Sequence, residues 1–144
     1  MRYWDSSALL PLLVQEATSE QVLECARSDP AIVTWWGTRI ECVSAIARLE
    51  RDDQLSSHGV RAALARLEAL SREWSEVPAL EELRSHATRL LRTHRLRSAD
   101  ALQLAAAIIA ADGSTSSLAF MTLDVRLAEA ADREGFELPL PVLG

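Results

Sequence analysis

RSADALQLAAAIIA, residues 97–110, is the stretch that decides the fold. Its alanine-rich composition predicts a helix that begins at Ser98 and ends at Gly113, because glycine commonly follows the last turn of a helix. A short apolar segment at residues 118–122 then predicts a strand. This alternation of helix and strand is typical of a parallel sheet with helices on both faces.

The same alternation continues through the rest of the chain. Strands are expected at 1–4, 31–34, 74–77, 118–122 and 136–142, and helices at 8–14, 18–28, 38–53, 57–70, 78–94, 98–113 and 125–134. Pro139 and Pro141 place the last strand at an edge of the sheet. We therefore expect an α/β fold over residues 1–144: a single-domain three-layer sandwich with a central parallel sheet of four to five strands flanked by helices.

Two helix starts carry the spacing of a capping box, in which a hydroxyl side chain and a Glu or Gln three residues later cap the helix together. These pairs are Thr18 with Gln21 and Thr38 with Glu41. The amphipathic segment 57–70 is expected to pack on the protein's own core, although it could also line a surface for a partner.

Composition limits the class of protein. Of the 144 residues, 49% are hydrophobic, 25% are charged and only 5 are Gly, which is typical of a globular domain. Two Cys are too few for a disulfide framework, a charge comes too early for a signal peptide, and no apolar run would span a membrane. We expect a cytoplasmic protein without membrane contact.

The charge argues against nonspecific binding of nucleic acid. The net charge is −6, and all 15 basic residues are Arg. A role on RNA would therefore depend on bound metal and on local groups of Arg.

Four acids lie where a predicted strand ends or a predicted helix begins: Asp5, Glu41, Asp100 and Asp124. The carboxyl ends of parallel strands meet at one edge of a sheet, so at least Asp5 and Asp124 should share that edge. Clustered carboxylates repel one another, and a divalent metal relieves the repulsion. Each acid taken singly also has a structural explanation, as a helix cap or a first-turn residue.

Four motifs occur in order: YWDSSALL at 3–10, ECVSA at 41–45, RSADALQLA at 97–105 and FMTLDVRLA at 120–128. With them the chain resembles PIN-domain proteins from about Arg2 to Val142, and its length is similar to that of the VapC-like toxins of bacterial toxin–antitoxin pairs. The resemblance implies a divalent-metal-dependent endoribonuclease that hydrolyses RNA phosphodiester bonds, with tRNA or rRNA as the expected targets.

The resemblance also implies residue roles. The catalytic acids would be Asp5, Glu41, Asp100 and Asp124, with Asp5, Asp100 and Asp124 as metal ligands and Glu41 positioning metal or water. Ser7 and Thr122 would hydrogen-bond carboxylates or a water on the metal. The expected cofactor is Mg²⁺, with Mn²⁺ able to substitute, because both prefer oxygen ligands.

Contacts with RNA and protein partners follow less directly. Several Arg residues near the acids could bind RNA phosphates, although solvation or ion pairing is an equal alternative: Arg39, Arg92, Arg95, Arg97 and Arg126. Trp35 and Trp36 depart from the small residues usual in the family here; they could stack on bases, or be buried or cover an oligomer interface. The resemblance further implies a cognate antitoxin and a homodimer.

Two other functions remain open from the sequence. The acidic charge and the absence of Lys also suit a catalytically silent PIN-fold module that binds RNA or a protein partner. A phosphoacceptor regulatory domain is the less favoured alternative, because such a domain would ordinarily use a Lys that this chain lacks.

Overall fold

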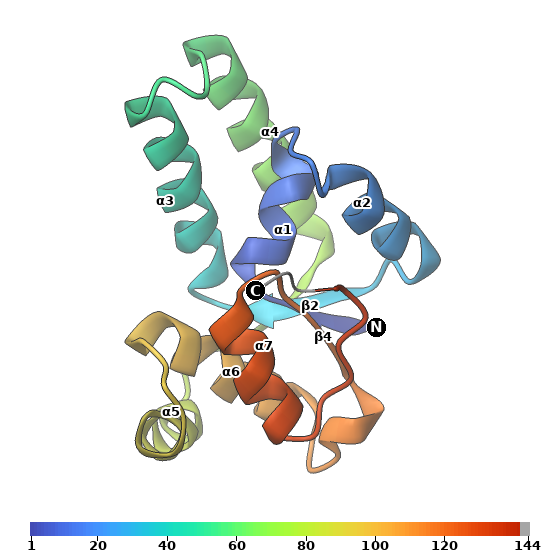
Figure 1. The fold of residues 1–144 in the computed structure, drawn as a ribbon, viewed down its shortest axis with the longest axis vertical. Coiled ribbons are helices and arrows are strands. Elements are labelled where there is room, and N and C mark those ends of the chain that lie inside the picture. The colour runs from blue at the N-terminus through green and yellow to red at the C-terminus, as the bar shows by residue number, and fades with distance from the viewer. Residues whose placement is uncertain (142–144) are drawn as a thin grey trace.

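The structure, a computed structural model, describes residues 1–141 and consists of a small parallel sheet between two groups of helices (Figure 1). The strands are β1 (Arg2–Trp4), β2 (Ile32–Trp35), β3 (Ser75–Val77) and β4 (Ala119–Met121). The helices are α1 (Ser6–Leu13), α2 (Ser19–Ser28), α3 (Thr38–Arg51), α4 (Ser57–Glu73), α5 (Glu81–Thr93), α6 (Ser98–Ala110) and α7 (Val125–Arg133), with a short 3₁₀ turn, η1, at Thr115–Ser117.

The sheet has the strand order β3-β2-β1-β4, and every pairing is parallel. Tyr3 on β1 pairs with Val33 on β2 and with Phe120 on β4. Because all strands run in one direction, their carboxyl ends lie at the same edge. The predicted α/β sandwich with a central parallel sheet is confirmed.

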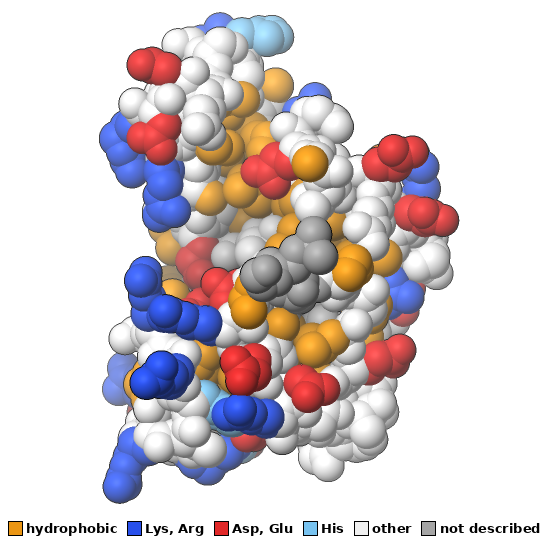
Figure 2. All heavy atoms as spheres, viewed as in Figure 1, with side chains coloured by type: hydrophobic (Ala, Val, Ile, Leu, Met, Phe, Trp, Pro, Cys, Tyr) orange, Lys and Arg blue, Asp and Glu red, His pale blue; other side chains and the backbone are white. Residues whose placement is uncertain are grey.

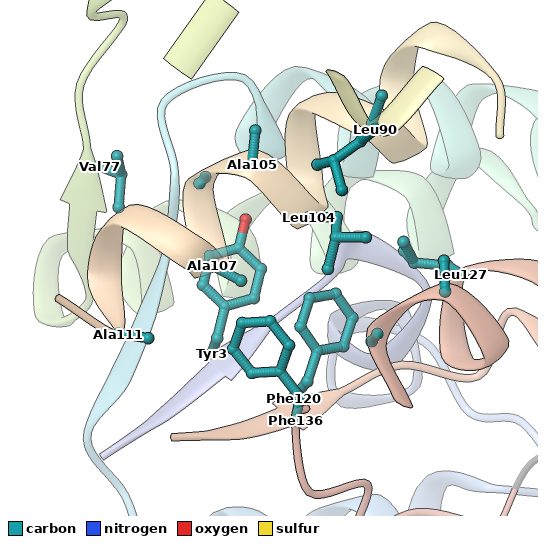
Figure 3. Close-up of a cluster of buried hydrophobic side chains, with 14 of the residues drawn as sticks. Tyr3, Val77, Leu90, Leu104, Ala105, Ala107, Ala111, Phe120, Leu127 and Phe136 are labelled. Carbon is teal, nitrogen blue, oxygen red and sulfur yellow. The ribbon is translucent and has the colours of Figure 1, made fainter. Parts of the chain in front are cut away.

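Successive residues of β1 face opposite sides of the sheet, and each side has its own core. Tyr3 lies in the cluster beneath α5, α6 and α7, where it stacks on Phe120 with ring centroids 5.2 Å apart. Figure 3 shows these two rings with Phe136 below α6. Trp4 lies in the cluster formed with α1 to α4. Both side chains are fully buried, so β1 is the centre of the fold.

The helices on one face include a long hairpin of α3 and α4, which rises from the sheet beside α1 (Figure 1). Ala63 and Leu67 of α4 are buried in the core of this face, so the helix packs on the protein itself. No helix within residues 1–141 is both long and apolar enough to cross a membrane.

The predicted last strand, 136–142, is wrong over the residues that are described. Only Glu137 forms a bridge, parallel to Ala119, and its carbonyl accepts a hydrogen bond from the Phe120 N–H at 2.8 Å. Pro139 and Pro141 have no N–H with which to continue a ladder. Val142 lies outside the described residues.

Both predicted capping boxes are also wrong. Thr18 precedes α2 but makes no side-chain cap. Thr38 is already inside α3, and its hydroxyl lies 2.6 Å from that of Thr34, while the Glu41 carboxylate turns to other partners. At Thr38 and Glu41, side-chain contacts with other parts of the folded protein replace the local cap that the spacing suggested.

Candidate active site

Asp5 follows β1 directly and is the N-cap of α1, where one carboxylate oxygen, Oδ2, collects three donors. The Ser7 backbone N–H and hydroxyl donate to it, and so does the Thr122 hydroxyl at 2.9 Å. Within residues 1–141, the other oxygen, Oδ1, has only a long contact of 3.4 Å with the Ser6 hydroxyl. Asp5 is therefore held firmly on one side and keeps one oxygen for a further ligand.

Burial raises the pKa of Asp5, and the negative charge of Asp100 raises it further, while the hydrogen bonds from Ser7 and Thr122 oppose both effects. Asp100, in the first turn of α6, lines the same cleft as Ser6 and Ser7, which follow Asp5. Thr122 also accepts the Asp124 N–H at 3.1 Å, so a single hydroxyl connects Asp5 to the start of α7.

Glu41, in the first turn of α3, is turned toward the interior. Its Oε2 accepts the Gln103 amide at 2.8 Å and the Trp35 indole N–H at 3.3 Å, and its Oε1 lies 3.4 Å from the Ser6 hydroxyl. Burial, followed by the charge of Asp5, raises the pKa of Glu41 to about 7, against the hydrogen bonds that favour the ionised form.

Asp100 and Asp124 each lie at the start of a helix. Asp124 caps α7 by accepting the Leu127 N–H at 2.8 Å, and Asp100 accepts the Arg97 N–H at 3.4 Å in the first turn of α6. Burial and the charge of Asp124 raise the pKa of Asp100, while Arg97 and Arg126 act in the opposite direction. The four predicted acids thus lie together, and each also has the local role of a helix start.

Within residues 1–141, none of these four carboxylates forms an ion pair with a basic side chain. Their oxygens are the hard ligands that Mg²⁺ prefers, and their unpaired charge suits a divalent cation. The described residues contain no group of three His, Cys, Asp or Glu side chains already close enough to enclose an ion. The donor type and charge therefore fit a metal, whereas the ligand set is not preformed.

One cleft is lined by two of the acids, and a second is lined by Arg126, two residues after Asp124. The first, of about 430 Å³, lies between α1, α3 and α6 and is lined by Ser6, Ser7, Leu10, Glu41, Ser44, Ala45, Arg48, Ala99 and Asp100. The second, of about 530 Å³, lies between the end of α5 and α7 and is lined by Arg92, Thr93, His94, Arg95, Arg126, Glu129, Ala130 and Arg133. Figure 2 shows acidic side chains in a recess between two groups of basic side chains, along the edge formed by α3, α5 and α7.

The predicted RNA-contacting arginines divide between these surroundings. Arg92, Arg95 and Arg126 line the second cleft. Arg97 is exposed and near enough to Asp100 to lower its pKa. Arg39 is exposed on α3 and, within residues 1–141, lines neither of the two clefts.

Trp35 and Trp36 have different surroundings. Trp35 is half-buried against the core, and its indole N–H reaches Glu41. Trp36 is 63% exposed and meets Trp35 edge to face, with ring centroids 6.3 Å apart. Of the two indoles, only Trp36 presents a free face to solvent within the described chain.

Two residues of the site were not predicted from the sequence: Gln103, whose amide donates to Glu41, and Arg48, which lines the first cleft. Gln103 is three residues after Asp100, and Arg48 is seven after Glu41, so each lies on the same helix face as a predicted acid. Helical spacing from the acids was the signal that could have found both.

The sequence profile of the PIN domain matches residues 2–133. Among solved structures, the chain is similar to the crystal structure of FitAcB from Neisseria gonorrhoeae, with a TM-score of 0.70, 18% identity and coverage of 96% of both chains. It is also similar to a toxin–antitoxin complex from Klebsiella pneumoniae, with a TM-score of 0.53, 19% identity and coverage of 88% of both chains. Comparison with curated proteins finds no match. Since the PIN profile spans nearly the whole chain, the protein belongs to the PIN domain family.

Proposed function

We propose that this protein is a divalent-metal-dependent endoribonuclease, the toxin of a toxin–antitoxin pair. The observation that carries the proposal is the meeting of Asp5, Glu41, Asp100 and Asp124 at one edge of the sheet. Three of them have raised pKa values, because burial and mutual repulsion are not balanced by an ion pair within residues 1–141. Such a cluster is typical of a site that receives a cation.

Family membership supports the same function. PIN domains are typically nucleases and generally use divalent metal ions. One structural neighbour is described as a toxin–antitoxin complex, which supports an antitoxin as the partner of this chain. A homodimer remains part of the proposal by family resemblance.

We assign Asp5, Asp100 and Asp124 as the residues that would hold Mg²⁺ or Mn²⁺. Asp5 contributes the oxygen that Ser7 and Thr122 leave free. Asp100 and Asp124 approach from the starts of α6 and α7. When bound, the ion supplies a more acidic water and a counter-charge for the phosphate.

The protein side chains then supply the proton transfer and the binding of substrate. Glu41, with a pKa of about 7, can accept the proton of the attacking water at neutral pH. The water oxygen bonds to phosphorus as the bond from phosphorus to the 3′-oxygen breaks, and the 3′-oxygen takes up a proton from solvent, which leaves a 5′-phosphate and a 3′-hydroxyl. Arg97 and Arg126 flank Asp100 and would bind the adjoining phosphates.

The second cleft supports RNA as the substrate. Arg92, Arg95 and Arg126 line it, and within residues 1–141 none of the three forms an ion pair with an acid. Unpaired guanidinium groups in a chain of net charge −6 are suited to a polyanion that crosses from this cleft to the acids. The exposed Trp36 could stack on an unpaired base.

The test is cleavage of purified total tRNA and rRNA with Mg²⁺, with Mn²⁺ and with chelator, beside Asp100→Asn. We expect discrete, metal-dependent products that the variant does not form. Equal cleavage by Asp100→Asn would contradict the proposal. RNA binding without turnover under every condition would instead favour the catalytically silent binding module, which the acidic net charge also suits.

A further inference from the structure

Gln103 is a polar residue on the buried face of α6, among Leu104, Ala105 and Ala106. Its side chain is fully buried, and its hydrogen bonds go to two other elements. The Tyr3 hydroxyl of β1 donates to Gln103 Oε1 at 2.7 Å. Gln103 Nε2 donates to the Thr38 hydroxyl at 3.0 Å and to Glu41 Oε2 at 2.8 Å, both on α3.

The chemistry of the partners fixes the orientation of this amide. When Glu41 is ionised, its carboxylate can only accept, so the NH₂ group faces Glu41, as the 2.8 Å hydrogen bond shows. The Tyr3 hydroxyl then donates to the amide oxygen on the opposite side. A flipped amide would set its oxygen against the carboxylate of Glu41.

The position of Gln103 connects two of the acids. Asp100 lies three residues earlier on α6, on the same face of the helix. The hydrogen bond from Gln103 to Glu41 therefore joins α6, the helix that carries Asp100, to the Glu41 carboxylate on α3. Tyr3 anchors the amide to the central strand, which ends one residue before Asp5.

We infer that Gln103 is a positioning residue of the site, which holds the Glu41 carboxylate at a fixed place relative to Asp100 and Asp5; this inference rests on the proposed nuclease function. Packing alone does not call for a glutamine here, because the surrounding face of α6 is aliphatic. A buried amide is stable only when its hydrogen bonds are made, and the strongest of these ends on a charged group of the site.

The experiment compares Gln103→Leu and Tyr3→Phe with the wild-type protein. Gln103→Leu keeps much of the volume but removes every donor and acceptor, whereas Tyr3→Phe removes only the hydroxyl that fixes the amide. We expect Gln103→Leu to lower kcat by about 10- to 100-fold with KM unchanged, and Tyr3→Phe to give a smaller loss. Combined with Glu41→Gln, Gln103→Leu should cause little further loss, since it acts through Glu41.

A second measurement does not depend on activity. The indole N–H of Trp35 donates to the same oxygen of Glu41, so its nitrogen-15 NMR resonance, assigned with Trp35→Phe, reports the position of that carboxylate. We expect the resonance to shift in both Gln103→Leu and Tyr3→Phe, but not in the control Arg61→Gln, which changes an exposed residue of α4.

The outcomes separate the two proposals. Wild-type kcat in both variants, an unmoved Trp35 resonance, or a double variant whose losses multiply would overturn the role of Gln103. If the wild-type protein cleaves no RNA, the nuclease proposal fails, and the Trp35 resonance alone decides whether Gln103 positions Glu41. If Gln103→Leu does not fold, the milder Tyr3→Phe carries the same test.

Discussion

Asp5 and Glu41 form the inner half of the acidic site, and Asp100 and Asp124 form the outer half. The carboxylates of the two halves have different surroundings. The inner carboxylates accept hydrogen bonds from several neutral side chains, and two of these, Thr122 and Gln103, come from distant parts of the sequence. The outer carboxylates accept backbone N–H groups of their own helices, and two arginines lie near Asp100. All four acids follow local helix rules, and the inner half depends in addition on tertiary contacts.

Asp5→Asn should have the largest effect, because it removes charge from the inner half while keeping an oxygen for Ser7 and Thr122 to donate to. We expect RNA cleavage to fall about 1000-fold with the fold retained, which is the upper end of the effect of about 10²- to 10³-fold that one such group has. Cleavage rates and circular dichroism would measure this. The control is the exposed Asp132→Asn, and similar losses in both variants would contradict a special role for Asp5.

Glu41→Gln should have the next largest effect, on both rate and stability. We expect kcat to fall about 100-fold or more, as for removal of a general base. In chelator, the raised pKa of Glu41 makes folding take up a proton, so wild-type stability should decline as pH rises from about 4.5 to about 7.

The size of that decline is at most about 3 kcal/mol, from the pKa of about 7. Urea unfolding at a series of pH values would measure it, and Glu41→Gln should flatten this part of the curve. A wild-type free energy of unfolding that increases with pH over the same interval would show that the negative charge of Glu41 does not destabilise the fold.

Asp100→Asn tests the outer half. The pKa of Asp100 is raised, so its charge destabilises the metal-free fold above the ordinary pKa of an aspartate, about 3.9. We expect the variant to lose activity yet melt a few degrees higher at pH 7 in chelator, where 1 kcal/mol corresponds to about 2–4 °C. The gain should vanish below about pH 3.9. An unchanged or lower melting temperature at pH 7 would make Asp100 chiefly a helix-start residue.

The smallest effect is expected from the arginines beside the outer half. Binding would be measured in chelator, so that the RNA is not cleaved. Arg95→Gln should raise the Kd for RNA several-fold. It should also reduce the slope of log Kd against log salt concentration by about 1, as expected for the loss of one phosphate contact. Fluorescence anisotropy would measure both quantities. Arg61→Gln, on the exposed face of α4, is the matched control, and equal losses in the two variants would indicate that the second cleft does not bind RNA.

Much of the fold followed from local rules. Strand–helix alternation predicted the parallel sheet, and four of the five expected strands are confirmed. The prediction of a last strand was wrong because Pro139 and Pro141 lack the N–H groups that a strand needs for its hydrogen bonds, although the segment is hydrophobic. The capping boxes were wrong because the Thr38 hydroxyl and the Glu41 carboxylate found partners outside their own helix start.

The sequence by itself determined the positions of the four acids, because the end of a strand and the start of a helix are local features that also direct side chains to one edge of a parallel sheet. Only the tertiary structure decided what surrounds each acid. Thr122 meets Asp5 across 117 residues of chain, and Gln103 meets Glu41 across 62, so no local spacing encodes either contact. Burial and hydrogen bonding set the charge state of a carboxylate, and both depend on which distant segments pack against it.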